Sequence, residues 1–274
     1  MQKHKIEYWV SWLPLSSVIY THNWKRYCLT LLYLLTITLL LFISRHSVAD
    51  NAKVITLNTT TKPPLSTSNQ QGFLDLIATT AMSRIGLKLE ILALPAERAL
   101  LDANAGILDG ELARVPGIEK AYKNLILIPE KLMDVEFTIF SIKHNSIAEP
   151  GWDGLQNTSV AFLNGWKILE RNVPKSAEIT KVNSPTQLFN LLKFNRVDYI
   201  IYEKWGGIAL AKSMGIENVN TLSPPLAVRQ LHIYLHRKHQ EHASSLANAL
   251  KQLKDDGTYQ NIYNETLGPF THRP

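Results

Sequence analysis

Residues 159–172, with the sequence SVAFLNGWKILERN, decide the fold class of this chain. Ser159–Leu163 is a short apolar run typical of a buried strand, Asn164-Gly165 is a turn pair, and Trp166–Asn172 predicts a short helix. A strand that passes through a tight turn into a helix is the repeating unit of α/β folds. This stretch therefore predicts a sheet that is covered by helices.

The same order of strand and helix continues on both sides of this stretch. Downstream, residues 184–187 (SPTQ) place a capping Ser before a Pro and put a Gln three residues after the cap, which predicts a helix start. A strand at Val197–Glu203 follows. Upstream, Val54–Leu57 and Leu87–Leu92 are expected strands on either side of a helix near residues 72–85. The predicted fold class is α/β, with a mostly parallel sheet.

Two extended stretches are candidates for crossings between two lobes. Asp134–Lys143 is the longest β-favouring stretch and is followed by a polar break at His144–Gly151. Gln230–His236 is extended and precedes a long helical pattern, so it can carry the chain back to the first lobe. We expect lobe 1 to comprise residues 50–140 and 236–274, and lobe 2 to comprise residues 141–235.

The N-terminal segment predicts export from the cytoplasm. Lys25-Arg26 precede an apolar run, Cys28–Ile43, and Ser47-Val48-Ala49 presents small residues at both positions that a signal peptidase reads. We expect residues 1–49 to be a signal peptide cleaved after Ala49, so that the mature chain works in the periplasm. The alternative is an uncleaved inner-membrane anchor, although the apolar run is somewhat short for a span.

The net charge of +6 belongs mainly to this leader. The first 49 residues hold five of the 29 Lys and Arg but one of the 23 Asp and Glu, so the remainder has 24 bases and 22 acids. A nearly neutral remainder without a basic stripe argues against a nucleic-acid partner. The one cysteine, Cys28, lies in the leader, so we expect neither disulfides nor thiolate chemistry in the mature chain.

Several short motifs follow one another in an order that resembles a known family. They are Pro63-Pro64, Ile85-Gly86, Gly106-Ile107-Leu108-Asp109, Val160-Ala161-Phe162 with Asn164-Gly165, Asn195-Arg196-Val197-Asp198, and Asp256-Gly257-Thr258-Tyr259. Over nearly all of Val54–Gly268 the chain resembles the extracytoplasmic solute-binding proteins of the amino-acid-binding type, family 3 of the bacterial ABC transporter substrate-binding proteins. The segments around Arg98 and Arg114 are similar to a branch whose ligand is uncertain.

The resemblance implies a two-lobed periplasmic-binding-protein type II fold with two crossings between the lobes. It also implies a monomer that binds a small polar solute, amino-acid-like or carboxylate-bearing, without a cofactor, for uptake through an inner-membrane ABC permease. Two alternatives stay open: a dehydratase-like enzyme on the same fold, with Glu203 or Glu111 as general acid or base, and a ligand-sensing module for a membrane partner. No arrangement of nucleophile and base is visible, which favours a binding protein.

Two arginines are candidates for gripping a ligand carboxylate. Arg114 follows the expected strand at residues 109–112, and Arg98 begins the helix after Pro95. A guanidinium can hold a carboxylate through two parallel hydrogen bonds. The alternative for either arginine is a salt bridge to Glu97 or Glu111. The resembled family places its carboxylate-binding arginine somewhat later, so the correspondence is not residue for residue.

Two acids are candidates for the cleft. Glu203 ends a strand, and the resemblance implies an acid at this position that meets the ammonium group of a ligand. Glu111 is the other candidate, and either acid could instead pair with Arg114, because buried charges need partners.

A turn and a loop supply the remaining candidates. The resemblance implies that Gly165, Trp166 and Lys167 contribute donors to the ligand, and Trp166 suggests a stacking wall; the alternative is that Trp166 packs between helix and sheet. Thr60 and Thr61 could donate hydroxyl groups to a ligand or make ordinary turn hydrogen bonds.

Four histidines form the one cluster in the mature sequence that resembles a metal site. They are His232, His236, His239 and His242. The first two would share a strand face, whereas the other two belong to a turn and a helix start, so their convergence is not required by the spacing. We expect a solvated surface and no metal.

Overall fold

A computed structural model describes residues 29–34 and 52–271, with the side chain of Lys167 left out. The contacts divide the chain into Met1–Asn51 and Ala52–Pro274. Residues 29–34 are helical, and the rest of the expected signal peptide, with its cleavage point after Ala49, lies outside the described residues. Within the described ranges, no helix has the length and apolar character needed to cross a membrane.

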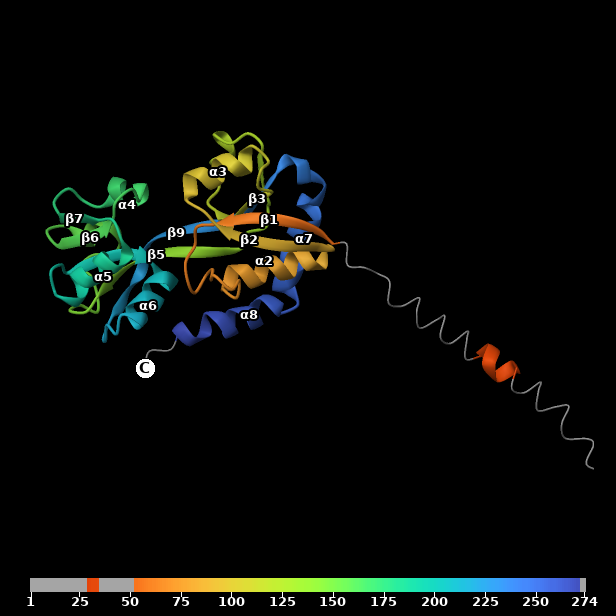
Figure 1. The fold of residues 1–274 in the computed structure, drawn as a ribbon. Helices are drawn as coiled ribbons and strands as arrows, with labels where there is room; N and C mark the ends of the chain where they lie inside the picture. Colours follow the sequence, from red (N-terminus) through yellow and green to blue (C-terminus); the bar gives the residue numbers. More distant parts are fainter. Residues whose placement is uncertain (1–28, 35–51, 272–274) are drawn as a thin grey trace, which may run out of the picture. The chain divides into compact units, whose positions relative to one another are not determined.

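Strands and helices alternate along Ala52–Pro274 (Figure 1). The strands are β1 Lys53–Thr59, β2 Leu87–Ala93, β3 Gly110–Arg114, β4 Leu125–Leu127, β5 Met133–Ser141, β6 Ser159–Leu163, β7 Glu178–Val182, β8 Tyr199–Glu203 and β9 Asn220–His236. The helices are α2 Phe73–Arg84, α3 Ala96–Asn104, α4 Lys167–Asn172, α5 Pro185–Lys193, α6 Lys204–Ser213, α7 Ala243–Asp255 and α8 Thr258–Thr266. Short 3-10 helices are η1 Ile118–Lys120, η2 Gly151–Leu155, η3 Arg237–His242 and η4 Gly268–Phe270. The predicted α/β class is confirmed.

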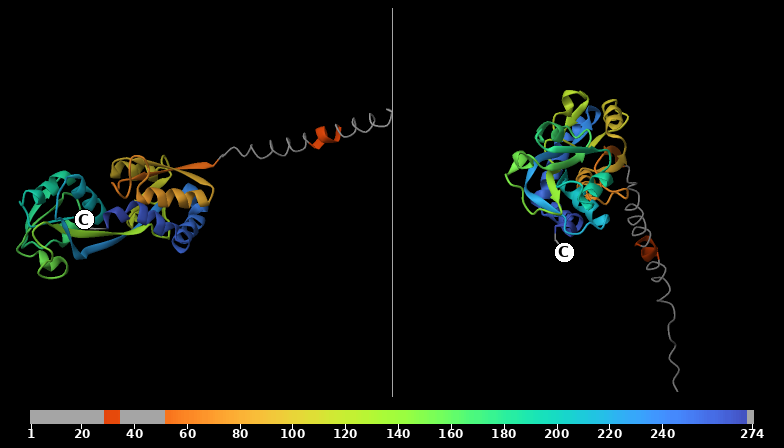
Figure 2. Two further views of the ribbon diagram at one scale, coloured as in Figure 1. Left: turned by 90° about the horizontal axis from the view of Figure 1, so that it is seen from below. Right: turned by 90° about the vertical axis from the view of Figure 1, so that its left-hand side faces the viewer.

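The strands join in the order β2-β1-β3-β9-β5-β8-β6-β7, with β4 also paired to β9. Strands β1, β2 and β3 are mutually parallel, as are β6, β7 and β8, whereas β5 and β9 run antiparallel to their neighbours. The long strands β5 and β9 extend from one lobe to the other (Figures 1 and 2). They form the two crossings.

The hydrophobic cores show where each crossing strand changes lobe. Along β5, Val135 belongs to the core of lobe 1 and Ile139 to a core of lobe 2. Along β9, Leu226 belongs to lobe 2 and Leu231 to lobe 1. The first change of lobe therefore occurs inside β5, before the polar break. The lobe limits at residues 140/141 and 235/236 stay a prediction, and the cores place both changes of lobe a few residues earlier.

Lobe 1 has its main core under helices α2 and α7. Fully buried side chains of α2, among them Phe73 and Ile77, pack with Ile55 of β1 and Leu250 of α7. Helix α3 lies on the other face of the lobe 1 sheet, where Ala103 packs against Tyr234 of β9. Burial of each apolar side chain of this size stabilises the fold by about 1.5–3 kcal/mol, so these helices hold the crossing strand β9 in place.

Lobe 2 has a core on each face of its sheet because successive strand residues point to opposite sides. Tyr199 and Ile201 of β8 face the core under α4, whereas Ile200 and Tyr202 face the core under α5 and α6. This alternation follows directly from the pattern of β8. Glu203 is the last residue of β8 and lies at the edge of the lobe.

Helix α6 and the first half of β9 are not apparent in the sequence pattern. Gly206 and Gly207 argue locally against a helix, yet a Cβ at Gly207 would lie 2.2 Å from Cζ of Phe140. The glycine is therefore required where the helix meets β5. In β9, Pro224-Pro225 interrupts the strand pattern. The predicted cap of α5 is confirmed, since Ser184 accepts a hydrogen bond from the Gln187 N–H at 3.2 Å.

Candidate ligand-binding site

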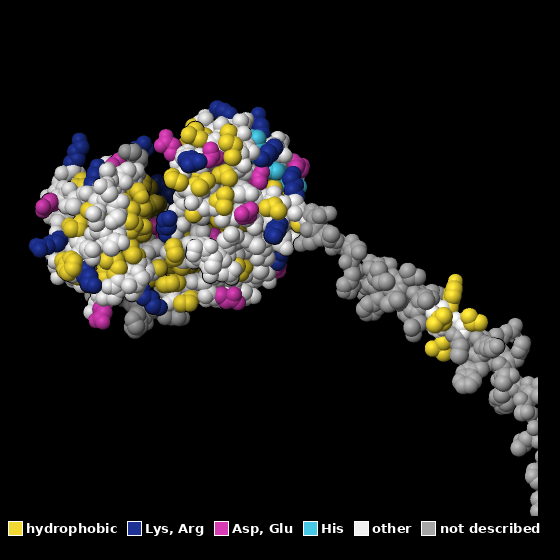
Figure 3. All heavy atoms as spheres, in the orientation of Figure 1, with side chains coloured by type: hydrophobic (Ala, Val, Ile, Leu, Met, Phe, Trp, Pro, Cys, Tyr) yellow, Lys and Arg dark blue, Asp and Glu magenta, His cyan; other side chains and the backbone are white. Residues whose placement is uncertain are grey.

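A cavity of about 550 Å³ is lined by residues of both lobes and of the two crossing strands. Figure 3 shows the hollow between the lobes, with hydrophobic side chains on both of its sides. Lobe 1 contributes Thr60, Thr61, Lys62, Leu65, Ala113, Arg114 and Val115. The crossing strands contribute Val135, Phe137 and Leu231, and lobe 2 contributes Gly165, Trp166, Ile168, Tyr202, Glu203 and Gly206. This volume suits a small organic molecule.

The lobe 1 rim is held in place by the buried carboxylate of Asp75. It accepts hydrogen bonds from Ser66 Oγ at 2.6 Å, from the Thr67 N–H at 2.8 Å and from the Gly72 N–H at 3.0 Å. These bonds tie the loop after β1 to the start of α2. Thr61, which lines the cavity, shares a hydrogen bond of 2.8 Å with the Thr59 hydroxyl, so the expected turn bonding is present.

Arg114 is the last residue of β3 and lines the cavity. Its Nε donates to Oε2 of Glu111 at 2.8 Å, and the two side chains are 15% and 1% exposed. Asn58 Nδ2 donates to the same carboxylate oxygen at 3.2 Å. Burial raises the pKa of Glu111, whereas the charge and hydrogen bond of Arg114 lower it. Glu111 is thus the structural partner of Arg114 and lies outside the cavity lining.

Arg98 does not reach this site. Its side chain is 76% exposed, and its Nε lies 3.7 Å from the carboxylate of Asp102, one helical turn further along α3. The predicted ligand contact at Arg98 is therefore not supported by its position, and its acid partner is neither Glu97 nor Glu111. A solvent-exposed pair of this kind contributes little to stability.

Trp166 forms an aromatic wall on the lobe 2 side. Its ring stacks on Tyr202, with centroids 5.0 Å apart and planes at 20°, and meets Phe137 edge-on at 5.5 Å. The residue lines the cavity and also packs against both lobe 2 cores. Trp166 therefore packs within lobe 2, as one interpretation of the sequence expected, and its role as a stacking wall for a ligand stays a prediction. Tyr202 and Phe137 were not among the predicted site residues. Phe137 lies in β5, Tyr202 lies in β8 and Trp166 lies in the turn before α4, so their contacts join segments that are far apart in the sequence.

The backbone of the turn before α4 already has partners. The Gly165 N–H donates to Glu170 Oε1 at 3.3 Å, and the Trp166 N–H donates to the Leu163 carbonyl at 3.4 Å. These bonds do not favour the predicted backbone donation to a ligand. The predicted contact of Lys167 lies outside the described residues, since its side chain is not described.

Glu203 combines a place in the cavity with the cap of helix α6. Its Oε1 accepts from the Trp205 N–H at 3.0 Å and its Oε2 from the Gly206 N–H at 2.7 Å. Burial raises the pKa of Glu203 to about 7, although these two backbone hydrogen bonds lower it. Each carboxylate oxygen can accept a further bond, so Glu203 is able to hold either a proton or a cationic group of a ligand.

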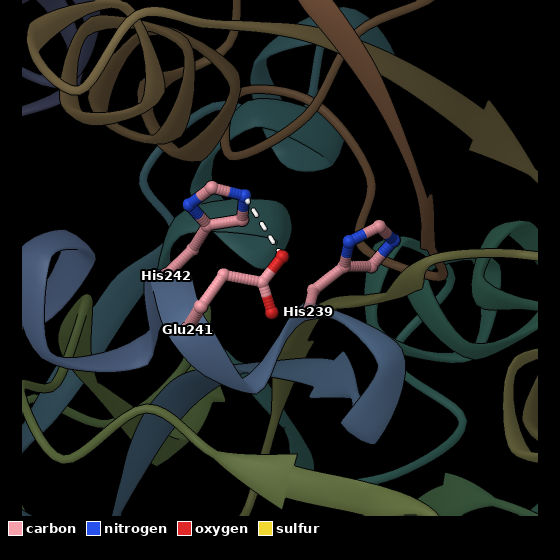
Figure 4. A group of neighbouring side chains, drawn as sticks. All are labelled: His239, Glu241 and His242. Atoms are coloured by element: carbon pink, nitrogen blue, oxygen red, sulfur yellow. Dashed lines mark ion pairs between the residues drawn. The ribbon is translucent and has the colours of Figure 1, made fainter.

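The four histidines of the sequence cluster separate into two sets. His232 Nδ1 pairs with the Ile128 carbonyl at 2.9 Å, and His236 Nδ1 accepts from the Lys238 N–H at 3.2 Å. His239 and His242 instead lie together with Glu241, which is not one of the predicted residues (Figure 4). This second group lies outside the cavity lining.

Comparison with known proteins supports the fold. No family model matches the sequence. An uncharacterized protein of Shewanella oneidensis is 26% identical over 210 residues, which cover 72% of this chain and 76% of that protein. The probable amino-acid ABC transporter extracellular-binding protein ytmK of Bacillus subtilis has a TM-score of 0.67 at 16% identity, over 80% of this chain and 100% of that chain.

A histidine kinase sensor domain with similarity to periplasmic binding proteins has a TM-score of 0.63 at 18% identity, over 80% of this chain and 98% of that domain. At these identities the likeness establishes the architecture. The chain has the two-lobed periplasmic-binding-protein type II fold.

Proposed function

We propose that this chain is an extracytoplasmic binding protein that encloses a small polar solute between its lobes. The observation that carries the proposal is the cavity of about 550 Å³, with Arg114 on its lobe 1 side and the stacked rings of Trp166 and Tyr202 on its lobe 2 side. A ligand that contacts both lobes stabilises the closed state, and the crossings in β5 and β9 supply the hinge.

Arg114 is suited to a carboxylate group of the solute. Its Nε is occupied by Glu111, and Glu111 is itself fixed by Asn58, so the guanidinium is oriented before a ligand arrives. The terminal nitrogens, one of which has only a long contact of 3.4 Å to the Ala96 carbonyl, can then grip a carboxylate in bidentate fashion. Thr61 lies on the same rim and can add a hydroxyl donor.

The lobe 2 side is suited to the rest of an amino-acid-like solute. The carboxylate of Glu203 can accept hydrogen bonds from an ammonium group, and the faces of Trp166 and Tyr202 can cover an apolar or cationic side chain. A solute with both a carboxylate and an ammonium group would thus bridge the two lobes. We propose ABC-type uptake as the biological use, with an inner-membrane permease as partner and the binding protein as a monomer.

Binding of an ammonium-bearing solute is expected to strengthen as the pH rises. A carboxyl group with a pKa of about 7 is ionised in about a tenth of molecules at pH 6 and about nine tenths at pH 8, so the affinity should rise about tenfold. Calorimetric titration at both pH values checks this. The rise should vanish in Glu203→Gln. It should persist in Glu136→Gln but with a midpoint at lower pH, because the charge of Glu136, which pairs with Lys204, contributes to the raised pKa of Glu203. A rise that persists in Glu203→Gln would assign it to another group.

A thermal-shift screen tests the proposed function itself. The panel comprises amino acids, polyamines, dipeptides and small carboxylates. Each is supplied at a concentration well above a dissociation constant in the millimolar range. A solute at 100 times its dissociation constant stabilises the folded state by about 2.7 kcal/mol, which raises Tm by roughly 5–10 °C in a domain of this size. The proposal expects a carboxylate-bearing hit. Hits confined to polyamines would contradict the role of Arg114.

A second candidate function is ligand sensing for a membrane partner. The likeness to a histidine kinase sensor domain favours it, and it would require the leader to remain attached. N-terminal sequencing of the exported protein separates the two. A start at Asp50 supports a released binding protein, whereas an intact segment at residues 29–43 supports an anchored sensor. The neighbours described above are a binding protein and a sensor, so we do not propose an enzyme.

A further inference from the structure

A second cluster of polar side chains lies in lobe 1, away from the ligand cavity. His239 and Glu241 belong to η3, and His242 is the cap of α7. One potential ligand atom from each of the three side chains lies within 4.8 Å of the others. Figure 4 shows the carboxylate of Glu241 between the two imidazole rings, with one nitrogen of each ring turned toward it.

His239 is buried and oriented by a carboxylate. Its side chain is 5% exposed, and its Nε2 lies 2.6 Å from Oδ1 of Asp109. Its Nδ1 is also buried and has no hydrogen-bond partner among the described residues. With Nε2 donating its proton to Asp109, Nδ1 carries a free lone pair. Metal-binding histidines in proteins are commonly oriented in this way by a carboxylate behind the ring.

An unpaired buried nitrogen is costly unless something binds it. Burying a polar atom without a partner costs about 1–3 kcal/mol. The backbone of His239 is non-helical within η3, with φ −114° and ψ 21°, and the ring is held by its contact with Asp109. The neighbouring Glu241 and His242 supply an anionic oxygen and a second imidazole. Two imidazoles and one carboxylate are the donor set of many zinc sites, in which a water completes the tetrahedron.

The distances suit a small tetrahedral ion after a modest adjustment. With metal–ligand bonds of about 2.1 Å, neighbouring ligand atoms of a tetrahedron are about 3.4 Å apart. The Nε2 of His242 lies 3.4 Å from Oε1 of Glu241, which matches this edge. Glu241 is 57% exposed and His242 is 24% exposed, so these two side chains can close the remaining gap to the fixed His239.

A lysine competes with the ion for Glu241. Lys53 Nζ lies 3.7 Å from Oε1 of Glu241, and the two side chains are 51% and 57% exposed. An exposed pair of this kind is worth little, so an ion can displace it. Lys238 Nζ lies 2.8 Å from Oδ1 of Asp109 and helps to keep that carboxylate in place behind His239.

We propose that His239, Glu241 and His242 bind a divalent transition-metal ion of the zinc type, with Asp109 as a positioning residue behind His239. The site lies beside Lys53 at the start of β1, whereas Thr60 and Thr61, which follow the end of β1, line the ligand cavity. It is therefore a separate site, and it does not depend on the proposed solute. The ion would join η3 to the start of α7, and the hydrogen bond from His239 to Asp109 already ties η3 to the residue before β3.

Calorimetric titration with zinc sulfate tests the site. The full chain is purified without a polyhistidine tag, freed of metal with a chelator and titrated beside four variants. We expect one zinc ion per chain, and an affinity that falls at least about tenfold in Glu241→Gln and in His242→Ala. Lys53→Ala should bind zinc at least as tightly as the parent protein, because it removes the competing cation. His144→Ala, which changes a histidine of lobe 2, is the matched control and should bind unchanged.

Two results would overturn the proposal. One is the absence of zinc binding up to about 1 mM, and the other is zinc binding that persists unchanged in both Glu241→Gln and His242→Ala. Equal melting temperatures of the parent and variant proteins in chelator would show that the substitutions at Glu241 and His242 leave the fold intact. A second measurement, zinc-dependent protection of backbone amides at residues 237–246 from hydrogen exchange, should be lost in His242→Ala.

Discussion

Replacing Arg114 by alanine is expected to lower the affinity for a carboxylate-bearing solute by about 100-fold. Removing one partner of a desolvated, charge-assisted contact costs about 2–5 kcal/mol, and 2.7 kcal/mol corresponds to a factor of 100. Arg114 lines the cavity and is held by Glu111, so the loss removes both the donor and its orientation. Calorimetric titration of the hit from the thermal-shift screen measures the change.

The same substitution also affects folding, which must be separated from binding. Glu111, whose side chain is 1% exposed, would lose its cationic partner, and breaking a buried pair costs about 3–5 kcal/mol. This loss raises the pKa of Glu111 further. At a pH between the pKa of Glu111 in the unfolded state and this raised pKa, the folded state holds a proton that the unfolded state has released. The variant should then be most stable at acid pH and lose stability as the pH rises through the raised pKa. Urea unfolding at several pH values checks this.

Two further variants keep the interpretation clear. Glu111→Gln combined with Arg114→Ala removes the unpaired charge while Asn58 retains an amide partner, so stability should recover and binding should not. Arg98→Ala removes an arginine that is 76% exposed and should leave both properties unchanged. Equal loss of binding in Arg98→Ala, or unchanged binding in Arg114→Ala, would contradict the assignment.

Replacing Trp166 by alanine is the prediction with the next largest effect. The indole covers one side of the cavity and stacks on Tyr202, so its removal opens the wall and frees the Tyr202 ring. We expect the affinity to fall roughly 10- to 100-fold, since stacking or cation–π contacts on a desolvated ring contribute about 1–2 kcal/mol and their orientation is lost as well. Trp166→Phe should recover part of this affinity.

Trp152 provides the matched control for Trp166. Both tryptophans are partly buried and pack against the same lobe 2 core, but Trp152 lies outside the cavity lining. Trp152→Ala should therefore lower the free energy of unfolding to a similar extent while leaving the affinity unchanged. If the two alanine variants lose affinity equally, Trp166 acts only through packing and the stacking wall is wrong.

The architecture could be predicted from the sequence because it depends on local periodicity. The strand, turn and helix at residues 159–172 appear in the structure as β6 and α4, and the capping pattern at residues 184–187 starts α5. Where local preference conflicts with packing, the sequence is less informative. The glycine pair inside α6 is such a case, since it is required by contact with Phe140 in another element.

The site was only partly predictable because its contacts are long-range. A salt bridge between Glu111 and Arg114 was one of the alternatives that the sequence left open, although residues three apart in a regular strand face opposite sides. The register of β3 against β9 shifts between these two residues, which allows the salt bridge. The pairing of Trp166 with Tyr202 likewise depends on how β6 and β8 are placed. Arg98 and Asp102, by contrast, are four residues apart on a helix, and their contact is readable from spacing.

The most direct test of the account is a distance measured between the lobes with and without a solute. Cys28 is the one cysteine of the sequence, so Cys28→Ser gives a background without thiols. The substitutions Lys88→Cys in lobe 1 and Lys175→Cys in lobe 2, both at exposed positions, then provide specific attachment points for two spin labels. Saturation with the hit from the screen should shorten this distance by more than about 2 Å, and Arg114→Ala should prevent the change at the same solute concentration. A distance that stays the same while the solute is fully bound would contradict closure of the two lobes around it.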